Sequence, residues 1–266
     1  LGFNFKWNMG WANDTFDYVE TDPVYRKFKH DKLTFPMMYS LNENYILPVS
    51  HDEVVHGKRS LLDKMFGDYN EKFAGDRLFM AYQICHPGKK LMFMGQEYGQ
   101  FREWDYENQL EWFMLDFDMH SKLRGFVMAL NRFYLENREL WDLDFSWDGF
   151  EWIYPDMSDL NIIAFRRMDK KGNELVMAFN FSPVTRYGFE IKPLTHARYI
   201  EAFSTDDEAF GGSGIRNQGA LDAVLYDTDD GGEEDGAPAK RRLTIDLPGL
   251  SAVILKPVGR AVRKTL

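Results

Sequence analysis

His51, Asp52 and Glu53 are the side chains in this sequence best suited to acid–base or sugar chemistry, and they follow directly on Ser50. They come at the end of an apolar run, residues 45–49, that is long enough for one buried strand. Active sites of α/β barrels lie at the carboxyl ends of such strands. A carboxylate beside an imidazole there can hold sugar hydroxyls and stabilise the positive charge of an oxocarbenium-like transition state. The alternative is a polar loop in which Ser50 or Asp52 caps the next helix.

A second polar segment, residues 95–105, also follows a short apolar run. If it lines a cleft, its tryptophan is placed to stack on a sugar ring. The alternative is structural: Glu97 pairs with Arg102, and the tryptophan packs beneath them. Trp7 stands at the end of another expected strand, where its position is suggestive but its type carries little specificity. The cleft-lining candidates of this segment are Gln96, Glu97, Arg102, Glu103 and Trp104.

The sequence argues against a metal or cofactor site. A zinc-binding helix needs two histidines four residues apart, whereas His51 and His56 are five apart. On a helix that spacing turns the second ring about 140° away from the first. Cys85 is the only cysteine, so there is neither an internal disulfide nor a Cys/His zinc pattern. We therefore expect no metal and no cofactor, and a reducing cytoplasm as the location.

Charge and hydropathy narrow the classes of partner. The net charge is −10, from 42 acidic and 32 basic residues. Without a long basic block we expect no nucleic-acid partner, and without an apolar run of roughly 18 residues we expect no membrane span. A neutral polysaccharide is compatible with an acidic protein.

The first half of the chain alternates strand-like and helix-like segments. Residues 3–9 predict a strand, and Asn13 or Asp14 is placed to cap a helix over residues 15–19. The later strands are predicted at 45–49 and 91–94, and the later helices at 71–85 and 120–140. This alternation predicts a parallel sheet with helices outside it, in about three β/α units. A complete (β/α)8 TIM barrel would need five more units.

After Leu140 the pattern changes to many short strands separated by turns, which is typical of an antiparallel β-sandwich. Residues 170–173 (KKGN) predict a hairpin turn between two of these strands. The acidic segment 227–235 predicts an exposed loop. We place the boundary near Asp142, which gives an α/β part at 1–141 and an all-β part at 142–266.

Several motifs resemble those of one enzyme family, the bacterial glycogen branching enzymes of the α-amylase superfamily, in their C-terminal part. The run at residues 47–58 is highly specific for branching enzymes within that superfamily, and the likeness covers nearly the whole chain except the acidic segment. The motifs are residues 1–11 (LGFNFKWNMGW), 22–26 (DPVYR), 30–35 (HDKLTF), 47–58 (LPVSHDEVVHGK), 87–100 (PGKKLMFMGQEYGQ), 149–153 (GFEWI) and 180–184 (NFSPV) with Arg186.

The resemblance implies the sixth to eighth units of a (β/α)8 barrel, followed by an all-β C-terminal domain. It also implies retaining transfer, in which an α-1,4 glucan is cut and the chain is passed to a 6-hydroxyl. Asp52 then corresponds to the third catalytic carboxylate, which stabilises the transition state, and His51 to a residue that binds sugar hydroxyls. Weaker substrate-binding candidates are Glu53, Trp7, Gln96 and Trp104.

The family's nucleophilic Asp and acid/base Glu belong to the fourth and fifth barrel strands, upstream of Leu1. We therefore expect the chain alone to be inactive, because retaining chemistry needs both carboxyls, about 5–5.5 Å apart. We also expect the barrel part to need its N-terminal half, or another chain, to cover it. Two alternatives remain open: a glycoside hydrolase of the same superfamily, and a non-catalytic glucan-binding module.

Overall fold

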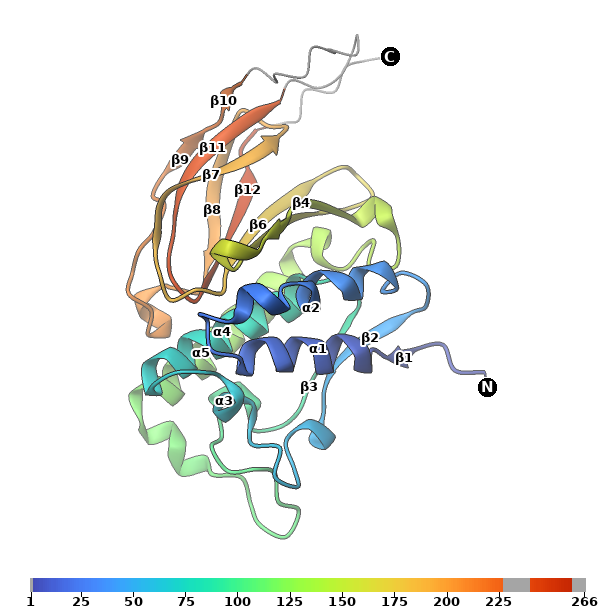
Figure 1. Ribbon diagram of the computed structural model, residues 1–266, viewed down its shortest axis with the longest axis vertical. Coiled ribbons are helices and arrows are strands. Elements are labelled where there is room, and N and C mark those ends of the chain that lie inside the picture. Colours follow the sequence, from blue (N-terminus) through green and yellow to red (C-terminus); the bar gives the residue numbers. More distant parts are fainter. Residues whose placement is uncertain (1, 227–239, 260–266) are drawn as a thin grey trace.

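Three parallel strands form the first sheet of the protein, and helices follow each of them (Figure 1). The structure, a computed structural model, describes residues 2–226 and 240–259. The central strand pairs in parallel with both neighbours, so the three expected β/α units are confirmed. The strands are β1 (Lys6–Trp7), β2 (Tyr45–Val49) and β3 (Lys89–Met92), and the long helices are α1 (Met9–Glu20), α4 (Tyr69–Cys85) and α5 (Asp118–Glu136).

Short helical turns connect these elements and recur in the second half of the chain. Each has three to five residues, so they set the path of loops rather than add a layer. They are η1 (Arg26–Lys29), α2 (Asp31–Thr34), η2 (Phe35–Met38), η3 (His51–Glu53), α3 (Leu61–Lys64), η4 (Gln96–Tyr98), η5 (Trp112–Asp116), η6 (Arg138–Leu140), η7 (Trp147–Gly149), η8 (Ser158–Leu160) and η9 (Glu208–Phe210).

The first helix begins earlier than the sequence pattern predicts, and the first strand is shorter. Asn8, rather than Asn13 or Asp14, caps α1: its side-chain oxygen accepts a hydrogen bond from the Trp11 amide at 3.0 Å. The Asn8 amide makes a further hydrogen bond to β2, to the Ile46 carbonyl, and the sheet pairing stops there because the helix begins at Met9. Gly10 lies inside α1, where a Cβ would collide with the Tyr39 hydroxyl.

The two longer helices differ from expectation at their ends, and α5 does so at both, since it begins at Asp118 rather than at about His120. Asp68 and Glu71 form a reciprocal capping box, with both hydrogen bonds 2.9 Å long, so α4 begins at Tyr69 instead of Glu71. α5 ends at Glu136 rather than Leu140, because Asn137 adopts an extended backbone conformation and a separate turn, η6, follows.

The second half of the chain forms two antiparallel sheets, which confirms the β-sandwich. A six-stranded sheet has the order β4-β5-β6-β12-β8-β9, and a three-stranded sheet has the order β10-β11-β7. Residues 170–173 join β5 to β6 as expected. The strands are β4 (Phe150–Met157), β5 (Ile162–Met168), β6 (Glu174–Asn180), β7 (Arg186–Leu194), β8 (Arg198–Ser204), β9 (Ala220–Asp222), β10 (Val224–Leu225), β11 (Arg241–Leu247) and β12 (Ser251–Pro257).

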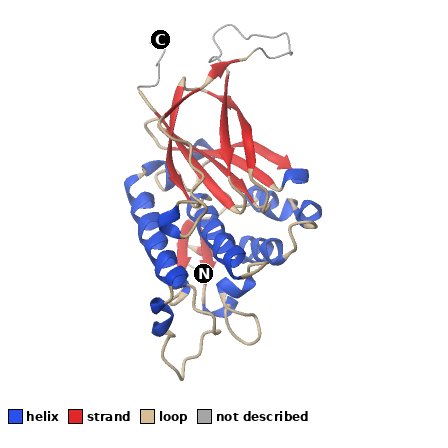
Figure 2. Cartoon of the chain, turned by 90° about the vertical axis from the view of Figure 1, so that its left-hand side faces the viewer, coloured by secondary structure: helices blue, strands red, loops and turns tan. Residues whose placement is uncertain are grey.

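One apolar core joins the two halves. It contains Phe79 and Tyr82 of α4 together with Phe165 and Phe179 of the six-stranded sheet, all buried. Figure 2 shows the helices lying against one side of this sheet. The division at Asp142 stays a prediction; the sandwich strands begin eight residues later, at β4. The acidic segment 227–235 lies outside the described residues.

Among residues 2–226 and 240–259, we find no helix that is both long enough and apolar enough to cross a membrane.

Candidate active site at the ends of β2 and β3

A capping box turns the chain sharply at the end of β2. The Ser50 hydroxyl accepts a hydrogen bond from the Asp52 amide at 3.2 Å. The Glu53 carboxylate in turn accepts from the Ser50 amide and the Ser50 hydroxyl, both at 2.7 Å. Glu53 is buried by this arrangement. Ser50 therefore does cap a helical turn, as the structural alternative holds, and the cap leaves the neighbouring His51 and Asp52 side chains at the surface.

His51 and Asp52 form a pair that faces solvent. Nε2 of His51 lies 3.3 Å from Oδ1 of Asp52, and the two side chains are 45% and 59% exposed. An exposed carboxylate beside an imidazole at the carboxyl end of a parallel strand can interact with a sugar and with positive charge that develops on it. The geometry is thus compatible with both roles that the resemblance implies.

Aromatic rings from the segment after β3 support the imidazole. The Trp104 ring lies edge-on to His51, with centroids 5.6 Å apart, and the Phe93 ring is 6.0 Å away. Phe93 and Trp104 are themselves perpendicular, at 5.2 Å. The Trp104 amide also donates to the Val54 carbonyl at 2.9 Å. Trp104 is therefore beside His51, as a sugar-contacting role requires.

Gln96 is buried between the two strands rather than open to solvent. Its side-chain oxygen accepts from the Phe93 amide at 3.0 Å, and its nitrogen donates to the Val49 carbonyl at 3.4 Å. It thereby links the end of β2 to the end of β3. In this structure Gln96 contributes to the wall behind the site.

Trp7 lies on the neighbouring strand but at a different level. It pairs with Ile46, in the first half of β2, and its side chain is 40% exposed. His51 lies beyond the other end of β2. The aromatic partners that the structure gives His51 are Phe93 and Trp104, so Trp7 is separate from that cluster.

The ion pair expected between Glu97 and Arg102 does not form, which corrects the structural alternative for this segment. The Glu97 carboxylate accepts from the Gly95 amide at 2.7 Å, because Gly95 adopts a left-handed conformation that points its amide at the side chain. Arg102 pairs instead with Glu111, at 3.7 Å.

Two contributors to the site carry no recognisable sequence signal. Phe93 is part of an apolar run that predicts only a strand. Lys58 donates from Nζ to the Asp52 carbonyl at 2.8 Å, but an exposed lysine in a loop predicts nothing by itself. In the part of the chain that the structure describes, no three His, Cys, Asp or Glu side chains are grouped so as to hold a metal ion.

Comparison with known proteins finds one matching domain family and relatives that are named 1,4-α-glucan branching enzymes. Residues 152–258 match the model of the α-amylase C-terminal all-β domain. The chain is 46% identical over 261 residues to the 1,4-α-glucan branching enzyme GlgB of Halothermothrix orenii, covering 98% of this chain and 40% of the relative. It is 55% identical over 223 residues to GlgB 1 of Clostridium perfringens strain 13, covering 83% of this chain and 33% of that protein.

Solved structures share the fold at low sequence identity. The α-amylase of H. orenii superposes with a TM-score of 0.55 and 16% identity, over 97% of this chain and 49% of the other. Pullulanase from Anoxybacillus sp. LM18-11, solved with maltotetraose, superposes with a TM-score of 0.60 and 14% identity, over 95% of this chain and 35% of the other. The chain spans about 40% of the length of the H. orenii branching enzyme. Together these findings identify the chain as a homologue of the C-terminal part of the 1,4-α-glucan branching enzymes.

Proposed function

We propose that this chain supplies His51 and Asp52 to the active site of a 1,4-α-glucan branching enzyme. The observation that carries the proposal is the exposed His51–Asp52 pair at the end of β2, within a chain 46% identical to a branching enzyme over 261 residues. In such an enzyme an α-1,4 glucan is cut and the chain is transferred to a 6-hydroxyl with retention of configuration.

The two side chains have different tasks in this proposal. The Asp52 carboxylate stabilises the positive charge that builds up on the sugar ring in the oxocarbenium-like transition state. The His51 imidazole donates a hydrogen bond to a sugar hydroxyl, and Trp104 and Phe93 restrict the ring to one orientation. Trp104 offers apolar surface to the glucan, whereas Glu53 and Gln96 act through the turn and the wall that they hold.

The nucleophile and the general acid/base are proposed to come from outside these residues. Asp105, in the loop after β3, already accepts from the Glu107 amide at 2.9 Å and from the Asn108 side chain at 2.6 Å. β1 ends the first sheet, and Phe3, Phe5 and Trp7 expose 85%, 47% and 40% of their surface beside it. In this proposal an N-terminal half of the barrel covers this edge. A cytoplasmic location remains a prediction.

The test uses the complete product of the gene and amylose as substrate. Branching lowers iodine colour without new reducing ends, whereas a hydrolase creates reducing ends and a binding module does neither. We expect Asp52→Asn to lower kcat by roughly 10²–10³-fold, as for loss of a group that stabilises transition-state charge. Asp105→Asn is the matched control and should keep wild-type activity. An Asp52→Asn protein as active as wild type would rule out the assigned role.

A further inference from the structure

The segment that follows Asp52 has an unusual backbone. His56, Gly57 and Arg59 have φ values of 55°, 83° and 67°. Two of these three are not glycine, and L-residues adopt this left-handed region with difficulty. Such a backbone persists only when surrounding contacts hold it.

A single carboxylate makes two of those contacts. Oε2 of Glu103 accepts a hydrogen bond from the Gly57 amide at 3.0 Å, and Oε1 accepts from the Arg59 amide at 2.6 Å. Glu103 thus holds two backbone amides that are two residues apart, and it does so from the loop after β3. These amides lower the pKa of the Glu103 carboxyl, so the side chain is ionised at neutral pH, which strengthens both hydrogen bonds.

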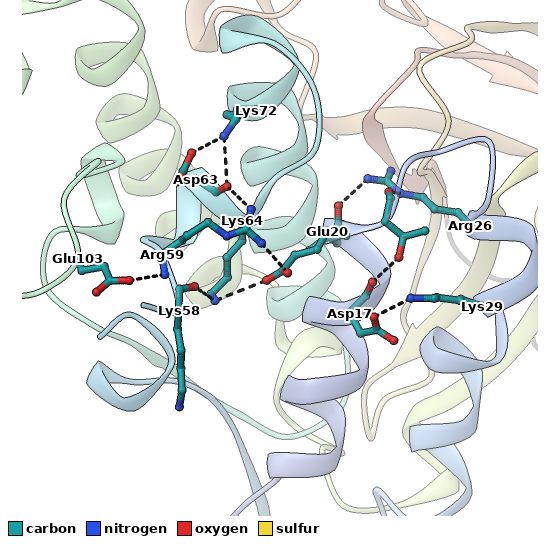
Figure 3. A network of polar contacts seen from close by, with 12 residues as sticks. Asp17, Glu20, Arg26, Lys29, Lys58, Arg59, Asp63, Lys64, Lys72 and Glu103 are labelled. Atoms are coloured by element: carbon teal, nitrogen blue, oxygen red, sulfur yellow. Dashed lines mark hydrogen bonds and ion pairs between the residues drawn. The ribbon is translucent and has the colours of Figure 1, made fainter. Parts of the chain in front are cut away.

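Further polar contacts hold the same segment from the opposite side (Figure 3). Arg59 pairs with Glu20 at 2.6 Å, and the nearly buried Lys64 lies 3.6 Å from the same carboxylate. Lys64 also donates to the Lys58 carbonyl. Residues 56–59 are therefore held between α1 and the loop after β3.

The segment is connected to the candidate active site. Lys58 donates from its side chain to the Asp52 carbonyl, and the Val54 carbonyl accepts from the Trp104 amide. Glu103 and Trp104 are adjacent in sequence, so one contacts the segment after Asp52 and the other contacts the His51 ring. A shift of the 56–59 backbone would move the anchors of both side chains.

We propose that Glu103 is a positioning residue for glucan transfer, which it serves by holding residues 56–59 and, through them, the Asp52 carboxylate. The inference rests on the proposed function, since it assigns a transition-state role to Asp52. Glu103 itself touches neither the sugar nor the reacting atoms.

The experiment compares Glu103→Gln with Glu107→Gln in the complete gene product. Both variants remove one negative charge from the same loop, but Glu107 is exposed and both amides donate to Glu103 instead. The glutamine at 103 has one acceptor oxygen where the carboxylate has two, so one amide loses its partner. Glu103→Asp, which keeps the charge on a shorter side chain, serves as a second variant. Three quantities are measured: hydrogen exchange of peptides covering residues 54–59, kcat and KM for amylose branching, and the melting temperature.

We expect Glu103→Gln to accelerate exchange in that peptide and to lower kcat roughly tenfold or more, as for a misplaced catalytic group, with KM changed less than twofold. Glu107→Gln should have the exchange rate and kcat of the wild type. Glu103→Asp should have values between those of the wild type and Glu103→Gln. Unchanged exchange in Glu103→Gln would overturn the proposal. So would accelerated exchange with wild-type kcat, which would leave Glu103 a loop brace only. A wild-type protein without branching activity would instead refute the proposed function, and the positioning role with it.

Discussion

The guanidinium of Arg167 lies 2.8 Å from the Asp144 carboxylate, and both side chains are almost completely buried. Arg167 belongs to β5 of the sandwich and also donates to the Cys85 carbonyl, at the end of α4, at 2.8 Å. Lys89 of β3 approaches the other Asp144 oxygen at 2.8 Å. Although burial alone would raise the pKa of Asp144, the charges of Lys90 and Arg167 hold it below its usual value. This cluster fastens the sandwich to the barrel part.

Removing one member of this cluster should destabilise the protein strongly. Asp144→Asn leaves the Arg167 charge buried without its partner, and we expect the free energy of unfolding to fall by roughly 3–5 kcal/mol. Urea denaturation followed by tryptophan fluorescence measures the change. Lys170→Gln is the control, because the exposed Lys170 lies 3.7 Å from Asp142 and such surface pairs contribute only about 0–1 kcal/mol. Equal midpoints for the two variants would contradict the prediction.

The capping box at the end of β2 predicts a second effect on stability. Glu53→Ala leaves the buried Ser50 amide and hydroxyl without their acceptor, and we expect a loss of roughly 1–3 kcal/mol. Glu136→Ala removes an exposed carboxylate at the end of α5 and should change little. Thermal melts of both variants decide the point. If Glu53→Ala has the same melting temperature as the wild type, the capping box does not stabilise the turn that carries His51 and Asp52.

Asp76 predicts a dependence of stability on pH. It is fully buried in α4, and neither of its carboxylate oxygens has a hydrogen-bond partner among the described residues. Burial raises its pKa to about 8, and the nearby Arg77 opposes this only in part. Because the folded protein holds this proton more tightly than the unfolded chain, its stabilising contribution is full below pH ~4 and is lost as the pH rises toward 8.

We therefore expect Asp76→Asn to be increasingly more stable than wild type between pH 4 and pH 8, by on the order of 5 kcal/mol at the upper end. Urea titrations at pH 5, 7 and 8.5 test this. The variant Asp116→Asn, which changes an exposed carboxylate, should follow the wild-type curve throughout. If the free energies of unfolding of Asp76→Asn and wild type differ by the same amount at all three pH values, Asp76 does not titrate in this range.

Trp104 predicts an effect on substrate affinity. Replacing it by Leu removes the ring that lies against both His51 and Phe93, and an aromatic contact of this kind is worth roughly 0.5–1.5 kcal/mol. We expect KM for amylose to rise about two- to tenfold, with a smaller change in kcat. Trp112→Leu provides the comparison, since that ring is 52% exposed and packs on Tyr98 instead. A similar rise in KM for both variants would argue against a specific glucan contact at Trp104.

Local sequence was sufficient to predict most of the elements and the position of the candidate pair, His51 and Asp52. The alternation of apolar runs predicted three β/α units and a sandwich, and the run 45–49 placed His51 and Asp52 just beyond a buried strand. The sequence also predicted that Ser50 could cap the next helical turn, because a capping box joins residues only three apart. The predicted helix ends were less accurate. Asn8, Asn13 and Asp14 could each cap the first helix, and only the pairing of β1 with β2 selects Asn8.

Tertiary structure decided which distant residues meet. Glu103 binds Gly57 across 46 residues of chain, Gln96 turns into the wall between β2 and β3, and Trp104 reaches His51. All three contacts join the end of β2, or the segment that follows it, to the segment that follows β3, and the parallel register setting Val49 opposite Met92 brings these parts together. Residue types and spacing determined the candidate chemistry of this protein, whereas the pairing of β2 with β3 determined the contacts that hold it in place.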